Sequence, residues 1–262
     1  MIISVINNKG GTGKTTTCVN LAAAFADSGF RVLVVDLDSQ ASASLSLGVQ
    51  YPDLSPSIAD ALYDGVPLES VIRENDVSGP DLITGCAHLA NSDLVLADVV
   101  GRETRLSQCL EPVRHGYDII LCDCPPSLSL LSVNALVASD CYLVPLTPEY
   151  LALEGLVSLM AAADEIKKNL ETRAALLGIV LTMVTAGVKV FREIEQLVRD
   201  HYQDIVFQTR IRRNVKVNEA PAHGKSIFTH APDSAGARDY AMLAGEVLER
   251  CGLTVSNGTR MD

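Results

Sequence analysis

The stretch NNKGGTGKTT, residues 7 to 16, contains the residue types that bind nucleotide phosphates. It matches the pattern G-x-x-x-x-G-K-[ST] except that Asn8 stands in place of the first glycine. It also follows an apolar run and precedes a helical pattern, which is the context that a phosphate-binding loop requires. Gly10, Gly11 and Gly13 predict a tight turn whose backbone N–H groups point at phosphate oxygens. The N-terminus of the following helix adds a positive partial charge.

The polar side chains of this loop predict distinct roles in nucleotide binding. Lys14 is the cation expected at the β- and γ-phosphates, and Thr15 carries the hydroxyl expected on Mg²⁺. Thr16 is placed to reach the α-phosphate, and Thr12 belongs to the same binding loop. A second lysine, Lys9, stands before the glycines, where a single phosphate loop has no use for it.

Acidic residues follow two apolar runs farther along the chain. Asp36 and Asp38 close one run, and Asp123 comes directly after four apolar residues in another. A carboxylate at the carboxyl edge of a parallel sheet can hold the hydration shell of Mg²⁺, so we expect Asp123 and Asp38 at the metal. Asp38 lies farther past the strand end and is expected to orient the attacking water. For both Asp36 and Asp38, the alternative is an acid that only caps the end of the strand.

The elements that must position these residues alternate along the chain. Uniformly apolar strands separated by helices predict an α/β fold: a doubly wound, mostly parallel sheet of about seven strands flanked by helices. The irregular stretch 48–80 should hold one short helix at 58–63. Apolar runs indicate strands within 2–7, 31–38, 81–85, 117–126, 141–148 and 175–184, and helical patterns cover 15–29, 103–116, 128–139, 149–170, 191–202 and 233–252.

Length and composition predict one domain, residues 1–252, followed by a polar C-terminal tail at 253–262. The formal net charge of −11 argues against a chain that coats nucleic acid with its whole surface, although it leaves room for a local basic patch. We find no secretory signal and no apolar run long enough to span a membrane, and expect a cytoplasmic protein. Seven scattered cysteines then predict reduced, structural thiols.

Five blocks of the sequence together resemble the ParA/Soj family of deviant-Walker partition ATPases, within the ParA/MinD superfamily. The blocks at 145–156 and 213–228 look specifically like the chromosomal ParA/Soj branch. The resemblance extends over nearly the whole chain. The blocks read NKGGTGKTT (8–16), VVDLDSQAS (34–42), DCPPSLSLLSVNAL (123–136), PLTPEYLALEGL (145–156) and RNVKVNEAPAHGKSIF (213–228).

The resemblance implies an ATP-dependent cycle. ATP with Mg²⁺ would be sandwiched between two copies of the chain, and this homodimer would bind DNA non-specifically. A ParB-like partner would stimulate hydrolysis, and the cargo would be a chromosome, a plasmid or a protein assembly on the nucleoid. Lys9 matches the signature lysine that reaches the phosphates bound to the partner. A cation supplied in this way would make hydrolysis depend on dimerisation, as an arginine finger does.

The resemblance also assigns residues in the second half of the chain. Asn214 matches an adenine-contacting asparagine, and Arg212 stands where the family usually has a proline near the adenine. Arg213 matches a DNA-binding arginine, and Lys216 belongs to the same basic cluster. Lys189 and Arg192 lie close to Gly187, at which the family often has a further DNA-binding arginine. From residue 210 to 225 the cluster has Arg210, Arg212, Arg213, Lys216 and Lys225 against Glu219.

Other functions compete with this interpretation. A MinD-like membrane-surface ATPase would need an amphipathic C-terminal helix with cations, whereas the chain ends in CGLTVSNGTRMD. An iron–sulfur reductase would need exposed paired cysteines, and Cys122 and Cys124 lie in or beside an apolar strand. A nucleotide binder without hydrolysis is opposed by Asp38 and Asp123. Ser39 and Ser42 replace a proline and an asparagine of the family pattern, which leaves the hydrolysis rate open.

Overall fold

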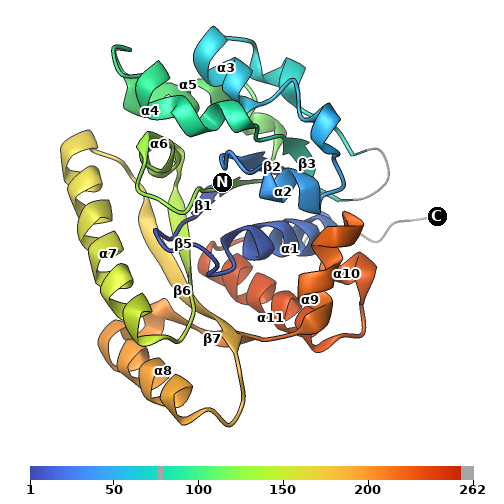
Figure 1. Cartoon of the computed structure of the whole chain (residues 1–262), viewed down its shortest axis with the longest axis vertical. Helices are drawn as coiled ribbons and strands as arrows, with labels where there is room; N and C mark the ends of the chain where they lie inside the picture. Colours follow the sequence, from blue (N-terminus) through green and yellow to red (C-terminus); the bar gives the residue numbers. More distant parts are fainter. Residues whose placement is uncertain (76–78, 255–262) are drawn as a thin grey trace.

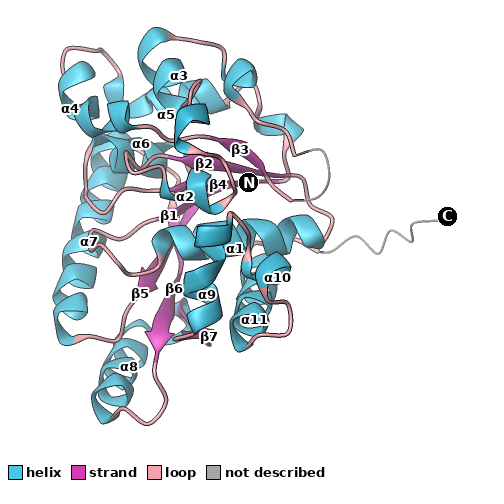
Figure 2. Cartoon of the chain, turned by 45° about the vertical axis from the view of Figure 1, so that its right-hand side comes forward, coloured by secondary structure: helices cyan, strands magenta, loops and turns pink. Residues whose placement is uncertain are grey.

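The computed structural model describes residues 1–75 and 79–254 and has three layers, with a seven-stranded sheet between two layers of helices (Figures 1 and 2). The strand order is β3-β2-β4-β1-β5-β6-β7, and every pairing between neighbouring strands is parallel. The strands are β1 Ile2–Val5, β2 Val32–Asp36, β3 Asp81–Ile83, β4 Ile119–Asp123, β5 Cys141–Leu146, β6 Ala175–Val184 and β7 Val206–Arg212.

Helices cover both faces of the sheet, because successive residues of each buried strand point to opposite faces. In β1, Ile3 and Val5 join a core with α1 and α11, whereas Ile2 and the following Ile6 join the core beneath α3, α5, α6, α7 and α8. The helices are α1 Lys14–Asp27, α2 Ser42–Ser46, α3 Ile58–Asp64, α4 Ser92–Val95, α5 Arg105–Leu110, α6 Leu130–Ala138, α7 Tyr150–Leu170, α8 Lys189–Tyr202, α9 Val215–Glu219, α10 Ile227–His230 and α11 Ala235–Arg250.

The strand order brings the predicted site residues to one edge of the sheet. β1 lies between β4 and β5, so the loop that follows β1 opens beside the carboxyl end of β4. The register aligns Asp123 of β4 with Val5 on one side and with Asp36 of β2 on the other. Ligands of doubly wound sheets bind at this edge, near the point where the strand order reverses.

The predicted fold class is confirmed, and two details differ from expectation. The predicted helix at 103–116 is split, and α5 ends at Leu110 because Pro112 restricts the backbone before it. Strand β7 falls in a stretch for which the sequence analysis located no strand. Its burial alternates between buried and exposed residues, a period-2 signal interrupted by arginines. The short helix expected at 58–63 is α3.

The C-terminal boundary is described only in part. Cys251 and Gly252 close α11, and the Leu253 N–H donates to the Leu248 carbonyl at 2.9 Å. The rest of the predicted tail, residues 255–262, lies outside the described residues. Among the residues that the structure describes, no helix is long and apolar enough to cross a membrane.

Candidate nucleotide site

The loop between β1 and α1 has the backbone of a phosphate cradle. Gly11 and Gly13 have φ angles of +72° and +86°, a left-handed conformation that favours glycine. A Cβ at Gly11 would meet no atom within 4 Å, so the loop faces open space there. The side chain of Asn7 braces the loop base: its Nδ2 donates to the Pro145 carbonyl at 2.7 Å, and its Oδ1 accepts the Lys9 N–H at 3.0 Å.

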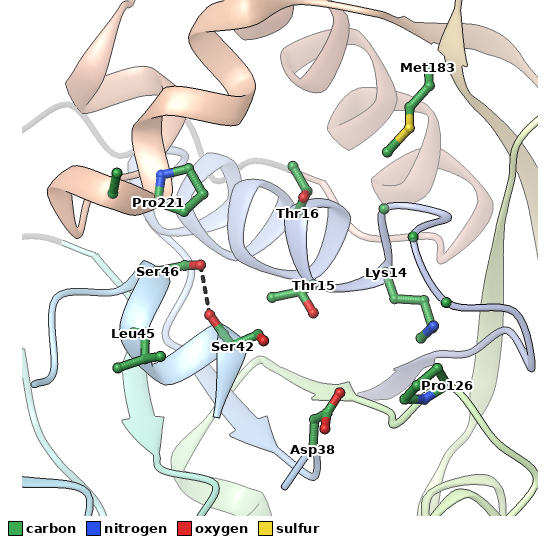
Figure 3. A pocket seen from close by; sticks show the side chains of 14 residues that line it. Lys14, Thr15, Thr16, Asp38, Ser42, Leu45, Ser46, Pro126, Met183 and Pro221 are labelled. Atoms are coloured by element: carbon green, nitrogen blue, oxygen red, sulfur yellow. Dashed lines mark hydrogen bonds between the residues drawn. The ribbon is translucent and has the colours of Figure 1, made fainter. Parts of the chain in front are cut away.

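This loop forms one wall of a cavity of about 570 Å³ (Figure 3). The cavity is roomy enough for a nucleotide, whose sites are typically clefts of about 300–1,000 Å³. Lys14, Thr15 and Asp38 point into this space in Figure 3. The lining residues are Gly10, Gly11, Gly13, Lys14, Thr15, Thr16, Asp38, Ser42, Leu45, Ser46, Pro126, Met183, Pro221 and Ala222.

Lys14 is the cation in the cavity lining. Its residue is only 6% exposed, and its Nζ donates to the Lys9 carbonyl at 3.0 Å. Burial lowers the pKa of the Lys14 ammonium, and the nearby Asp123 carboxylate opposes that shift. Among the described residues, the Lys9 carbonyl is the one hydrogen-bond acceptor for the three N–H donors of the Lys14 ammonium. An anionic ligand in the cavity would supply further acceptors.

Asp123 lies behind the loop, fully buried at the end of β4. Its Oδ2 accepts a 2.7 Å hydrogen bond from Thr15 Oγ1, whereas its Oδ1 has no hydrogen-bond partner among the described residues. Burial, and then the neighbouring Asp36, raise the pKa of Asp123 well above its usual range. A buried carboxylate with an unsatisfied oxygen beside a threonine hydroxyl fits the hydration shell of Mg²⁺.

The two acids after β2 have different surroundings. Asp36 is fully buried, and its Oδ2 accepts from both the backbone N–H and the hydroxyl of Ser44, at 2.8 and 2.7 Å. Asp36 therefore holds the turn into α2 and does not line the cavity. Asp38 lines the cavity opposite Lys14, as the choice of Asp38 as the water-orienting acid requires.

Lys9 points elsewhere than Lys14. Its Nζ forms an ion pair with Glu149 Oε2 at 2.6 Å, and both side chains are partly exposed, at 36% and 53%. Lys9 is absent from the cavity lining. Within one copy of the chain, therefore, Lys14 lines the cavity and Lys9 does not.

A second, smaller cavity of about 90 Å³ adjoins the first and shares Gly13, Thr16 and Met183 with it. Arg212 and Asn214 both line it, so the predicted adenine-side residues reach the same region as the loop. The Oδ1 of Asn214 also accepts the Lys216 N–H at 2.8 Å and caps α9. The Arg212 guanidinium is held by Asp239, with Nε 2.9 Å from Oδ2.

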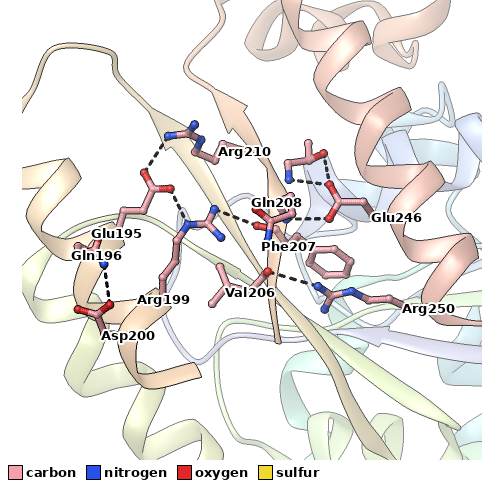
Figure 4. A network of polar contacts seen from close by, with 11 residues as sticks. Glu195, Gln196, Arg199, Asp200, Val206, Phe207, Gln208, Arg210, Glu246 and Arg250 are labelled. Atoms are coloured by element: carbon pink, nitrogen blue, oxygen red, sulfur yellow. Dashed lines mark hydrogen bonds and ion pairs between the residues drawn. The ribbon is translucent and has the colours of Figure 1, made fainter. Parts of the chain in front are cut away.

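The positive charge of the basic cluster is partly neutralised in the folded chain. Two of its residues belong to a strand: Arg210 and Arg212 lie on the exposed side of β7. Acids from distant parts of the chain pair with both: Glu195 of α8 with Arg210 at 3.1 Å, and Asp239 of α11 with Arg212 (Figure 4 shows the Glu195 contacts). Lys216 pairs with Glu219 at 2.8 Å.

The remaining DNA-binding candidates lie at the same sheet edge. The Arg213 N–H donates to the Val184 carbonyl at 3.0 Å, which places Arg213 beside the end of β6. The chain leaves β6 there and turns at Gly187 into α8, whose first residue is Lys189. Lys189 is 84% exposed along its side chain and lies 3.4 Å from Glu193. Arg192 follows in the first turns of α8.

Sequence reasoning missed the cavity wall contributed by α2 and by residues 221–222. Ser42, Leu45 and Ser46 come from α2. Pro221 and Ala222 lie opposite, where Gly48 and Gly224 approach so closely that a Cβ on Gly224 would be 2.6 Å from the Gly48 Cα. Ser42 and Pro221 fall inside two of the quoted blocks, which was the available signal.

The cysteines of the predicted strand are buried. Cys122 is 0% and Cys124 is 1% exposed, as expected of structural thiols. Among the described residues, no group of three or more His, Cys, Asp or Glu side chains is arranged to hold a metal ion.

Comparison with known proteins places this geometry in a family. Residues 1–176 match the AAA domain family. The sporulation initiation inhibitor protein Soj of Bacillus subtilis is 42% identical over 246 residues, covering 94% of this chain and 97% of that protein. The chromosome-partitioning ATPase Soj of Thermus thermophilus is also 42% identical, over 95% of each chain.

Solved structures agree in fold. The cobyrinic acid a,c-diamide synthase of Mycobacterium smegmatis, with bound ADP and magnesium, has a TM-score of 0.84 at 29% identity and covers 96% of this chain and 95% of that one. The cell division ATPase MinD of Pyrococcus furiosus has a TM-score of 0.77 at 25% identity, covering 95% and 98%. The chain therefore belongs to the Soj/ParA family of partition ATPases, within the ParA/MinD-type P-loop ATPases.

Proposed function

We propose that the protein is a Mg²⁺-dependent partition ATPase whose ATP-bound homodimer binds DNA non-specifically and hydrolyses ATP when a ParB-like partner stimulates it. The observation that carries this proposal is the separation of the two loop lysines, with Lys14 in the nucleotide cavity and Lys9 outside it. The cargo would be a chromosome, a plasmid or a protein assembly, and the protein would act in the cytoplasm on the nucleoid.

The residues of one chain bind and orient the nucleotide. The N–H groups of the glycine loop and the N-terminus of α1 face the phosphates, and Lys14 neutralises their charge. Asn214 and Arg212 line the adjoining cavity, which suits the base. Asp38, on the opposite wall, accepts a hydrogen bond from the attacking water and so fixes its direction.

Magnesium would be held by the Thr15 hydroxyl and, through its hydration shell, by Asp123 and Asp38. Bound Mg²⁺ supplies charge neutralisation at the phosphate oxygens. The buried Asp123 carboxylate, with its unpaired Oδ1, favours that assignment. The Thr15 hydroxyl donates to the buried Asp123 carboxylate, which keeps these two groups side by side behind the loop.

Lys9 would serve the nucleotide of the second copy. In this structure Glu149 holds the Lys9 ammonium at 2.6 Å, on an exposed surface where such a pair contributes only about 0–1 kcal/mol. The ammonium is therefore easily released toward phosphate charge on a facing copy, where it would stabilise the transferring phosphoryl group. Dimerisation would then be required for hydrolysis.

DNA binding would use Arg213, Lys216, Lys189 and Arg192, all at the carboxyl edge of β6 and β7 or in the elements that follow. Contacts of this kind reach phosphates and read no bases, so binding should weaken steeply with salt.

The test is a mobility-shift assay with a non-specific duplex in the presence of ATP, of ADP, and without nucleotide. The proposal predicts a shift with ATP alone that raised salt abolishes. Equal binding in all three states would contradict an ATP-controlled switch.

A further inference from the structure

A third cavity lies at the amino ends of the strands, far from the glycine loop. It measures about 540 Å³ and shares no lining residue with the nucleotide cavity. Cys141, the first residue of β5, and Cys251, directly after α11, both line it. This end of the molecule has no part in the proposed ATPase chemistry.

The two cysteines lie at one cavity although they are 110 positions apart in the chain. Cys141 belongs to an apolar cluster against which Cys251 packs, and the neighbouring Cys251 raises the pKa of the Cys141 thiol. Cys141 is 8% exposed, whereas Cys251 is only half-buried and so remains open to small solutes.

The backbone around Cys251 is firmly held. Its N–H donates to the Val247 carbonyl at 3.0 Å, and the preceding Arg250 donates to the carbonyls of Leu177 and Ile205, both at 2.9 Å (Figure 4 shows Arg250 among the network). The Arg250 guanidinium also lies 4.0 Å from the centre of the Phe207 ring. The end of α11, which directly precedes Cys251, is thereby fixed against β6 and β7.

The other cysteines differ in surroundings or access. Cys18, Cys122 and Cys124 are buried near one another, and burial raises the pKa of each thiol. Oxidants therefore have little access to these thiols, and little of the reactive thiolate forms. Cys109 is half-buried like Cys251, but its Sγ contacts the Ala61 carbonyl at 3.6 Å, and burial raises its pKa. The neighbouring Cys141 instead lowers the pKa of Cys251.

We propose that Cys141 and Cys251 form a peroxide-sensitive dithiol, in which oxidation creates a reversible disulfide between the first residue of β5 and the end of α11. The Cys251 thiolate attacks one oxygen of hydrogen peroxide, the O–O bond breaks, and hydroxide leaves and is protonated to water. Cys251 is then a sulfenic acid. The Cys141 sulfur, losing its proton to the departing hydroxide, attacks that sulfur and displaces water. Two thiols are oxidised and one peroxide is reduced to two waters.

The experiment treats the full native chain with hydrogen peroxide, blocks the remaining thiols, and maps peptides by mass spectrometry without reduction. We expect one cross-linked peptide pair containing Cys141 and Cys251, with the loss of two free thiols and their recovery by dithiothreitol. Cys109→Ser, which removes the other half-buried thiol, should form the same cross-link at the same rate. Cys251→Ser, and Cys251→Ala if the serine variant is unstable, should keep Cys141 as a free thiol.

Two results would overturn the proposal. One is that Cys141 and Cys251 stay reduced at peroxide concentrations that oxidise Cys109. The other is that the cross-link forms only in denatured protein. Neither result bears on the nucleotide site, because the readout is the thiol map and the two cavities share no residue.

Discussion

The phosphate loop and the basic stretch 210–225 were both predicted from the sequence as binding regions. The loop has the expected geometry, whereas acidic residues neutralise part of the basic stretch. In the loop, spacing determines geometry: Gly11 and Gly13 turn the chain, and Lys14 and Thr15 then project into one cavity. In the basic stretch, the positive charge was inferred from the excess of Arg and Lys over Glu along the chain. Glu195 and Asp239, far away in sequence, neutralise two of its arginines.

The difference arises from the range of the interactions involved. A loop closed by a helix start is a local structure, whose hydrogen bonds lie within a few residues. Charge balance on a surface depends on whatever the fold brings within a few ångströms. A motif is therefore a better guide to a site than a local excess of charge.

The largest expected effect concerns the loop cavity. Asp38→Ala should retain ATP binding and lose ATP hydrolysis by about 10²–10⁴-fold, because we propose that Asp38 orients the attacking water, whereas Lys14 and the glycine loop bind the phosphates. Steady-state phosphate release and nucleotide binding, measured side by side, check this. Asp53→Ala, at an exposed position outside the cavity lining, is the control. Phosphate release as fast in Asp38→Ala as in the parent would remove Asp38 from the mechanism.

The basic stretch should respond unequally to single substitutions. Arg213→Ala should weaken ATP-dependent DNA binding by about tenfold, as expected for loss of a charge-assisted phosphate contact. Arg210→Ala should have a smaller effect, because Glu195 already engages that guanidinium. Titration of a non-specific duplex at fixed salt measures both. If Arg210→Ala costs as much affinity as Arg213→Ala, counting charges along the sequence was the better guide.

A pH effect on stability should arise from Asp36, the buried acid at the end of β2. Burial raises the pKa of Asp36 to about 6, against the hydrogen bonds from Ser44 that lower it. The folded chain therefore binds this proton more tightly than the unfolded chain, in which the carboxyl has its ordinary pKa of 3.8. The ionised carboxylate costs stability above pH 6, and that cost is relieved as the pH falls from 6 toward 3.8.

The measurement is the urea midpoint of the nucleotide-free chain from about pH 7.5 to about pH 5. The parent should gain stability on acidification relative to Asp36→Asn, which cannot ionise. Asp53→Asn, at an exposed position, is the matched control and should follow the parent. Equal pH slopes for the parent and Asp36→Asn would show that Asp36 has no raised pKa. The comparison uses slopes because Asp36→Asn also changes the contacts with Ser44.

The smallest expected effect is at Lys216. Its ammonium is paired with Glu219 at 2.8 Å, on a surface where such a pair is worth about 0–1 kcal/mol. Lys216→Ala should lower DNA affinity less than Arg213→Ala and reduce the slope of log affinity against log salt by about one at most. A loss larger than that of Arg213→Ala would mean that Lys216 releases Glu219 and is the main phosphate contact.

Much of the fold could be predicted because most of the buried parallel strands are largely apolar, and because β2 and β4 end in aspartates. The sheet edge that holds Asp38, Asp123 and the loop followed from those strand ends. Strand β7 was missed because its exposed face carries arginines, which resemble a charged loop. The pairing of Lys9 with Glu149 joins residues 140 apart, and no local pattern reports such a contact.

The central claim, that the two lysines of one loop serve two different nucleotides, is tested most directly by comparing Lys14→Ala with Lys9→Ala. ATP binding is measured by titration and self-association by sedimentation, each with and without ATP. Lys14→Ala should weaken ATP binding by at least about tenfold, because a buried charged contact is lost. Lys9→Ala should bind ATP like the parent and fail to form the ATP-dependent dimer or to hydrolyse ATP. If both variants fail at the same step, the lysines share one function and the claim is wrong.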